Sequence, residues 1–313
     1  MSAEIESKTL NFIIDRLQID DDWFAWDGRG FRWWAGPLAQ RIHFAGRREL
    51  HGVVVSTLHI ETDLLSDVAA TAITWERLAA VNRLASFSAY VADVTARTVS
   101  LHASVTITDD NWLMARTLAL HAAALQTADA HAEAAELARA FGAEVRSSAH
   151  PARGPREILD EMLGVVEVYQ QRGQDPSPIA TEDLAELVHL EPRPWLLAMN
   201  EPRRLLADLD FAAGRPARLE LDAGATHPAL GSGLQISLAI PVEPDAAIAQ
   251  RLNANEATQP DAHQLGAWCV DPDRGLAFVS FVPSAACIPQ LPRAMVYHAA
   301  GRNEWARDLL FPQ

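Results

Sequence analysis

The stretch Arg116-Thr-Leu-Ala-Leu-His121-Ala-Ala returns near the other end of the chain as Arg293-Ala-Met-Val-Tyr-His298-Ala-Ala, 177 residues later. Upstream of each copy the expected elements also come in the same order. A short polar helix is followed by two strands joined by a tight polar turn. The sequence therefore predicts one module of helices and strands that is written twice.

The length and composition are typical of a soluble globular protein, and the net charge argues against a nucleic-acid partner. At 313 residues the chain is long enough for two domains of roughly 150 residues, each with its own core. Apolar residues make up 49% and charged residues 21%, which is ordinary. Proteins that bind nucleic acid concentrate Lys and Arg, whereas this chain has a net charge of −15. A basic or apolar protein partner is compatible with that charge.

Cysteine content and hydropathy predict a cytoplasmic protein with no membrane partner. Cys269 and Cys287 are the two cysteines, which is no disulfide framework, so a reducing compartment is expected. The acidic N-terminus lacks the basic and then apolar order of a signal peptide. No run approaches the roughly 20 apolar residues that cross a bilayer.

Residues 99–107 show the cleanest strand pattern in the chain. Alternate positions are apolar or polar, so one face of this strand is packed and the other is wet or covered by polar contacts. The apolar set is Val99, Leu101, Ala103, Val105 and Ile107, and the polar set is Ser100, His102, Ser104 and Thr106. Further strands are expected at 23–34 (a hairpin), 52–60, 87–94, 195–199, 206–211, 217–221, 234–242, 265–270 and 276–282.

The helices and the linker set the domain boundaries. An Ala-rich helical segment runs from residue 111 toward 140, with a candidate break at Thr127–Asp129, and Phe141-Gly142 closes it. Residues 143–155 have no periodicity and are rich in small residues, Pro and Gly. We expect modules at 1–142 and 156–313 joined by this linker. Because consecutive strands lack helical crossovers, the class is α+β with mainly antiparallel sheets.

Two matching segments carry a resemblance to a known family. Val81-Asn82-Arg-Leu84 precedes the strand at Phe87, and Leu252-Asn253-Ala-Asn255-Glu256 precedes the strand at Leu265. This order and these residues resemble the YbjN family, which shares its fold with type III secretion chaperones. The resemblance covers most of residues 5–140 and 155–313.

The chain also departs from the family pattern. Family members are commonly single modules that pair as homodimers, whereas this chain carries two. The second Asn of the stretch, kept at Asn255, is replaced by Ala85 in the first copy. The resemblance therefore implies an internal pseudo-dimer of two chaperone-like modules.

The function implied by this resemblance is non-enzymatic protein binding, with a client protein or partner subunit and no cofactor. Fold alone does not fix function. The alternative is a small-molecule- or metal-responsive regulator, or an enzyme, with a site between the modules lined by His121 and His298. The sequence shows no catalytic signature and no spaced set of metal ligands, so it predicts neither a catalytic residue nor a metal site.

The repeat-matched residues Arg116, His121, Arg293 and His298 are candidates for ligand binding or for structure. The histidines could act as paired ligands or bases near neutral pH, or could each hold a strand carbonyl by a hydrogen bond. The arginines could bind a partner's carboxylate, or could pair with an acid of their own chain.

An aromatic hairpin around Asp27-Gly28 is the candidate partner-binding surface. Asp-Gly between aromatic arms is a strong hairpin signal. Strict alternation cannot place all of these rings on one face, so either both faces of the sheet are covered or the surplus forms an exposed patch. The candidate residues are Trp23, Trp26, Phe31, Trp33 and Trp34.

Overall fold

The structure, a computed structural model, divides into two compact units. It describes residues 3–50, 52–69, 74–84, 86–175, 177–188, 196–212, 214–260, 262–288 and 290–312. Unit 1 consists of Met1–Leu78, Phe87–Val166 and Asn253–Leu265, and unit 2 consists of Ala79–Ser86, Glu167–Leu252 and Gly266–Gln313. Each unit therefore contains one short segment from the opposite half of the chain.

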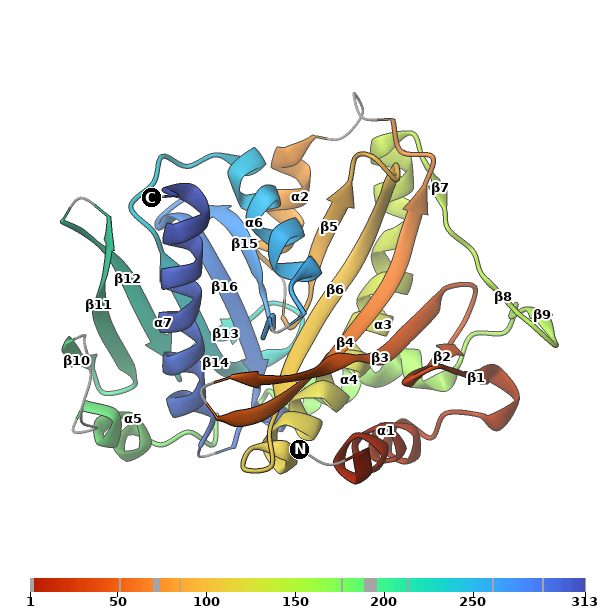
Figure 1. The fold of residues 1–313 in the computed structure, drawn as a ribbon, viewed down its shortest axis with the longest axis horizontal. Coiled ribbons are helices and arrows are strands. Elements are labelled where there is room, and N and C mark those ends of the chain that lie inside the picture. Colours follow the sequence, from red (N-terminus) through yellow and green to blue (C-terminus); the bar gives the residue numbers. More distant parts are fainter. Residues whose placement is uncertain are drawn as a thin grey trace. The chain divides into compact units, whose positions relative to one another are not determined.

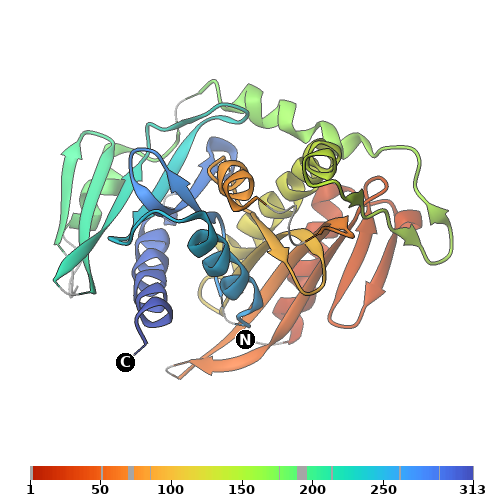
Figure 2. The ribbon, with the colours of Figure 1, turned by 90° about the horizontal axis from the view of Figure 1, so that it is seen from above.

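Unit 1 is built on an antiparallel sheet with the strand order β1-β2-β3-β4-β6-β5 (Figure 1). Short β7 (Glu144–Val145) pairs with β4. The β3–β4 hairpin projects beyond the other strands of this sheet (Figures 1 and 2). The strands are β1 (Phe24–Asp27), β2 (Gly30–Trp34), β3 (Ala39–Leu50), β4 (Val53–Ser66), β5 (Ala89–Asp93) and β6 (Thr98–Ile107).

Unit 2 repeats this arrangement with the order β10-β11-β12-β14-β16-β15, again antiparallel throughout. Short β13 (Thr226–His227) pairs with β14. The predicted α+β class is confirmed, and each strand predicted in the second half has its counterpart. The strands are β10 (Leu196–Glu201), β11 (Arg204–Ala212), β12 (Arg215–Asp222), β14 (Gly231–Ala239), β15 (Ala267–Asp271) and β16 (Gly275–Pro283). Trp195, the first residue of one predicted strand, lies outside the described residues, as does Ala85.

The helices flank these sheets, and α2, α4 and α6 each run across a boundary between the units' segments. Among the described helices, none combines the length and the apolar character that a bilayer span requires. The helices are α1 (Ala3–Leu17), α2 (Trp75–Asn82), α3 (Trp112–Phe141), α4 (Val165–Arg172), α5 (Thr181–Val188), α6 (Ala246–Thr258) and α7 (Leu291–Leu310). The remaining short elements are η1 (Asp21–Trp23), β8 (Ala149–His150), β9 (Gly154–Pro155), η2 (Glu161–Gly164) and η3 (Ser284–Ala286).

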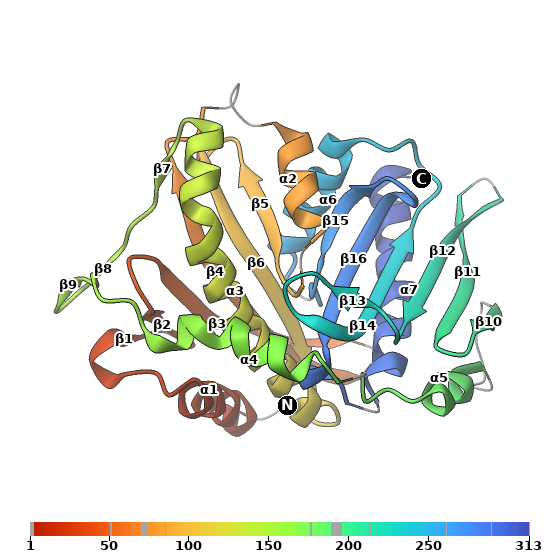
Figure 3. The same ribbon diagram turned by 180° about the vertical axis from the view of Figure 1, so that it is seen from behind.

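Helix α3 packs along one face of the unit 1 sheet as a single helix of 30 residues (Figure 3). The candidate break at Thr127–Asp129 does not occur, because buried packing on the sheet outweighs the weak helix propensity of these residues. The helix ends at Gly142, whose φ of 57° is left-handed. The buried face is largely alanine, which lets the helix backbone approach the strands.

A buried hydrogen-bond network centred on Gln126 joins α3 to this sheet. The Gln126 Nε2 atom donates to the Ile60 carbonyl oxygen and to Ser88 Oγ, each at 3.0 Å. Its Oε1 atom accepts from Thr62 Oγ1 at 2.9 Å and from Gln40 Nε2 at 3.2 Å. The Gln126 amide thus has a partner for both hydrogens and two donors to its oxygen, as a buried amide requires.

Residues 253–265 come from the second half of the chain but belong to unit 1, and we call them its received segment. This segment binds the polar face of β6. Ser104 N donates to the Gln264 carbonyl oxygen at 2.9 Å, and Gln264 N donates to Ser104 Oγ at 3.0 Å. Ser104 Oγ in turn donates to the Ala262 carbonyl oxygen at 2.9 Å. The predicted polar face of this strand is therefore covered by polar contacts rather than by water.

Unit 2 makes the matching contact with its own received segment, residues 79–86. Phe281 N donates to the Ser86 carbonyl oxygen at 3.3 Å, and Ser86 Oγ donates to the Phe281 carbonyl oxygen at 2.7 Å. Phe281 follows Ser104 by 177 residues, the interval of the terminal repeat. In both units the received segment thus binds the backbone of a matching strand, β6 or β16, at the equivalent position.

Candidate functional site

Three of the five aromatic residues predicted to bind a partner are core residues. Phe31, Trp33 and Trp34 are 0%, 1% and 2% exposed. Trp33 Nε1 donates to Gln40 Oε1 at 2.9 Å, and Trp34 Nε1 donates to Ser148 Oγ at 3.3 Å, so both indoles are satisfied inside unit 1. These rings form no binding surface, because Trp33 and Trp34 lie on opposite faces of the sheet and both faces are covered at this place.

Trp23 and Trp26 remain at the surface. Trp26 is 58% exposed and meets the Phe31 ring edge-on, with centroids 6.1 Å apart. Trp23 is half-buried, and the Arg156 guanidinium lies 5.1 Å from its ring centroid. The candidate aromatic surface is therefore limited to these two side chains.

The two repeat-matched histidines belong to different units. His121 lies on α3 in unit 1 and His298 on α7 in unit 2, and both are half-buried. Burial, with a smaller contribution from Arg302, lowers the pKa of His298 to about 4. A site shared by these imidazoles stays a prediction.

The pKa of His298 predicts that acid weakens unit 2. The unfolded chain binds a proton at this residue below about pH 6.5, whereas the folded chain does so only near pH 4. The unfolding free energy should therefore fall between these values, by about 1–2 kcal/mol at pH 5 from this residue. Urea unfolding of the wild type and of His298→Gln at pH 7 and pH 5 measures the difference. Equal pH dependence in the two proteins would contradict it.

The matched arginines lie over aromatic rings. The Arg116 guanidinium carbon lies 4.4 Å from the Phe12 centroid and 4.5 Å from the Trp112 centroid. Arg293 lies 6.0 Å from the Tyr297 centroid. Arg116 thus joins α1 to α3 by cation–π contacts, a structural role that the sequence did not indicate.

The cysteines show no sign of activation. Cys269 and Cys287 are both buried free thiols. Burial raises their pKa values, to about 12 for Cys269 and to about 11 for Cys287. A thiol is reactive as its thiolate, so neither residue is a nucleophile at neutral pH.

A row of three histidines crosses the opposite face of the unit 1 sheet from α3; we call it the histidine row. It consists of His43 on β3, His59 on β4 and His102 on β6. The His43 and His59 rings are stacked with centroids 5.5 Å apart, and His59 Nδ1 lies 3.1 Å from His102 Nε2. Glu61 is the register partner of His102, and its Oε1 lies 3.8 Å from His102 Nε2.

The received segment determines the tautomer of His102. Its Nδ1 lies 2.8 Å from Gln264 Oε1, an acceptor, so Nδ1 carries the hydrogen. The Nε2 atom is then a bare lone pair that faces His59 and Glu61. The Nε2 atom of His59 is also buried and has no hydrogen-bond partner among the described residues.

Burial keeps the histidine row neutral. Loss of hydration lowers the pKa values of His43 and His59 to about 4, with Arg41 adding to the effect, and that of His102 to about 3. Burial raises the pKa of Glu61, although Arg41 opposes this. At neutral pH the row therefore presents uncharged imidazoles, the form that binds metal ions.

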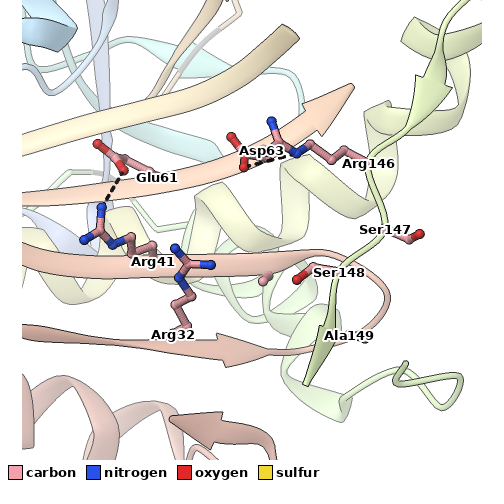
Figure 4. A pocket seen from close by; sticks show the side chains of 9 residues that line it. Arg32, Arg41, Glu61, Asp63, Arg146, Ser147, Ser148 and Ala149 are labelled. Atoms are coloured by element: carbon pink, nitrogen blue, oxygen red, sulfur yellow. Dashed lines mark ion pairs between the residues drawn. The ribbon is translucent and has the colours of Figure 1, made fainter. Parts of the chain in front are cut away.

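A cavity of about 490 Å3 opens beside Glu61 (Figure 4). Arg41 Nη1 lies 3.9 Å from Glu61 Oε2, and Arg146 Nε lies 3.5 Å from Asp63 Oδ2. Asp27 binds both Arg32 and Arg41, so the guanidinium charges around the cavity are balanced by carboxylates. The lining residues are Arg32, Ala39, Arg41, Glu61, Asp63, Arg146, Ser147, Ser148 and Ala149.

The histidine row has no counterpart in unit 2. The 177-residue interval aligns His102 with Val279, whose register partner is Ser237, and aligns Ser104 with Phe281, whose partner is Gln235. Gln235 therefore stands at the His59 position and Ser237 at the Glu61 position. The two sheets share a topology, but their chemistry differs at this place.

No local sequence pattern indicates the histidine row, since its members come from three different strands. Comparison of the chain with models of protein families, with curated proteins and with solved structures finds no match in any of the three. The arrangement of the side chains is therefore the basis for a functional assignment.

Proposed function

We propose that this chain is a non-enzymatic, cytoplasmic protein-binding or chaperone-like protein, built as a tandem of YbjN-like modules that form an internal pseudo-dimer. Two features support the duplication. The strand order is the same in both units, and the received segments bind at Ser104 and Phe281, which are equivalent positions. A pair of modules that complete each other in this way is what fusion of a homodimer would produce.

The observation that carries protein binding is a terminal strand flanked by exposed apolar side chains. Strand β1 ends its sheet, so its outer edge has no partner strand among the described residues. Trp26 on this strand is 58% exposed, and Ile158 and Leu159, on a segment that bonds to the end of β2 in the same hairpin, are 82% and 56% exposed. An open edge beside apolar side chains suits an extended polypeptide that adds a strand.

The segment with Ile158 and Leu159 is held next to the hairpin by several contacts. Arg156 donates from its guanidinium to the Trp34 carbonyl oxygen and stacks on Trp23. Asp160 N donates to the Ala35 carbonyl oxygen at 2.7 Å. The exposed apolar side chains therefore lie on an anchored segment, and their exposure is a property of the folded unit.

Removing the apolar side chains at this edge should abolish partner binding. We expect that a Trp26→Ala, Ile158→Ala double variant fails to retain the proteins that the tagged wild type captures from its native cytoplasm. Central apolar anchors typically contribute about 2 kcal/mol or more each at an interface. The matched control is Leu113→Ala, a 55% exposed residue on α3 rather than on a strand edge.

Hydrogen exchange of the purified complex distinguishes strand addition from other modes of binding. A polypeptide that pairs with β1 should slow amide exchange at residues 24–27. If the double variant captures the same proteins as the wild type, or if these amides are unchanged by the partner, the proposed surface is wrong.

A further inference from the structure

We propose that His59, Glu61 and His102 bind a divalent transition-metal ion of the zinc class. The donor set is two imidazole nitrogens and one carboxylate oxygen, and it leaves further positions for water or a ligand. Such a set suits Zn2+ and other divalent first-row transition metals. This inference is independent of protein binding. It places a metal site within unit 1 rather than between the repeats.

The distances between the donor atoms support a shared ion. One ligand atom from each of the three residues can be chosen so that all lie within 4.8 Å of one another. His59 Nδ1 and His102 Nε2 are 3.1 Å apart, and Glu61 Oε1 is 3.8 Å from His102 Nε2. Around an ion with bonds of about 2.1 Å, neighbouring ligand atoms lie roughly 3.0–3.4 Å apart. A small rotation of the Glu61 side chain closes the remaining gap.

The surroundings of His102 match those of a metal ligand. A metal-binding histidine almost always donates its other ring N–H to an oxygen acceptor, which sets the tautomer and the ring orientation. Gln264 Oε1 takes this part at 2.8 Å from Nδ1. Gln264 is held in turn by the backbone hydrogen bonds of the received segment to Ser104.

The two histidine ligands are buried, whereas the glutamate ligand reaches a cavity. His59 and His102 are 5% and 4% exposed, so an ion bound to them would be shielded on the side of the sheet. The Glu61 side chain is 36% exposed and lines the cavity of Figure 4, which gives an ion a route of entry and room for a further ligand.

The competing interpretation is a simple hydrogen bond from His59 Nδ1 to His102 Nε2. It satisfies those two atoms, and in either interpretation His59 Nε2 is buried without a hydrogen-bond partner among the described residues. It also predicts that divalent ions bind no better here than at any exposed carboxylate. Metal titration therefore separates the two interpretations.

The experiment titrates chelator-treated full-length protein with Zn2+ by calorimetry and with Co2+ by visible absorption. We expect one ion per chain and the intense visible bands of Co2+ held by protein nitrogen ligands. His102→Gln and Glu61→Gln should weaken binding by more than about 100-fold, since they remove a ligand. Gln264→Leu should weaken it by about 10- to 100-fold, because it frees the tautomer of His102.

Asp63→Asn is the matched control, because Asp63 is a cavity carboxylate two residues from Glu61 that belongs to no ligand set. It removes the same charge as Glu61→Gln and should leave the affinity within about twofold if coordination, not charge, holds the ion. Circular dichroism checks the fold of each variant. If the His102→Gln variant does not fold, the affinity of the Glu61→Gln variant tests the proposal, because the Glu61 side chain is 36% exposed and its substitution disturbs the core less.

Two results would overturn the proposal. One is a wild-type protein that shows no saturable Zn2+ binding and only the weak spectrum of hydrated Co2+. The other is an equal loss of affinity in Asp63→Asn and Glu61→Gln, which would show that the ion responds to charge around the cavity and not to these three ligands.

Discussion

The fragment Met1–Val166, produced on its own, should fail to reach the fold of unit 1. It contains every strand of that sheet but lacks residues 253–265, which belong to the same unit. Ser104 and His102 would lose their hydrogen bonds to Ala262 and Gln264 on a buried face. Each unsatisfied buried group costs about 1–3 kcal/mol, and a domain has only about 5–15 kcal/mol of stability.

Circular dichroism, thermal unfolding and light scattering of the fragment measure this outcome. The matched control is the full chain with a protease site in the exposed turn at 151–153, cut after folding. The cut chain keeps all segments of both units, so its two pieces should stay together and retain the spectrum of the intact protein. A fragment that is a folded monomer with the stability of the intact unit would show that the received segment is dispensable.

Gln126→Leu should lower the unfolding free energy by about 3–5 kcal/mol, a large effect for a single substitution. Leucine is close to glutamine in size but leaves four groups without their partner: the Ile60 carbonyl, Ser88, Thr62 and the Gln40 amide. The Gln40 amide keeps its second contact to the Ala123 carbonyl oxygen at 3.0 Å. Urea unfolding with matched m-values gives the difference.

Thr127→Val is the control for this experiment. Thr127 is the next residue on α3 and is 2% exposed, but its Oγ1 has no hydrogen-bond partner among the described residues. Replacing an unpaired buried hydroxyl by a methyl group should change the stability by less than about 1 kcal/mol. A loss in Gln126→Leu as small as that of Thr127→Val would show that the network contributes little.

Periodicity predicted most of the strands, and it failed where the pattern is interrupted. The alternation at residues 99–107 predicted both the β6 strand and its two faces. Strand β3 was missed, and β4 was predicted only to residue 60. The outer face of β3 carries charged side chains, and a bulge between Phe44 and Arg47 shifts its register with β4. Alternation then changes phase within the strand, so a search for period two finds no continuous run.

The received segments and the histidine row could not be read from local patterns. His59 and Glu61 are two residues apart on one strand, which places them on one face, but His102 joins them only through the β4–β6 register. Gln264 comes from a segment far along the chain. The sequence did place His102 on a polar face that needed contacts, and this was the one available signal. The prediction that the aromatic hairpin binds a partner was wrong for Phe31, Trp33 and Trp34, which are buried. Amino-acid composition alone does not show which aromatic rings are exposed.

The absence of histidines from the matching positions in unit 2 has a consequence for how such a protein can change. In a homodimer of single modules, one codon alters both copies, so every substitution must be tolerated twice. In the fused pair that we propose, each copy is released from that constraint. Val279 and Phe281 can then stay apolar in unit 2, while the matching positions at His102 and Ser104 change in unit 1 alone.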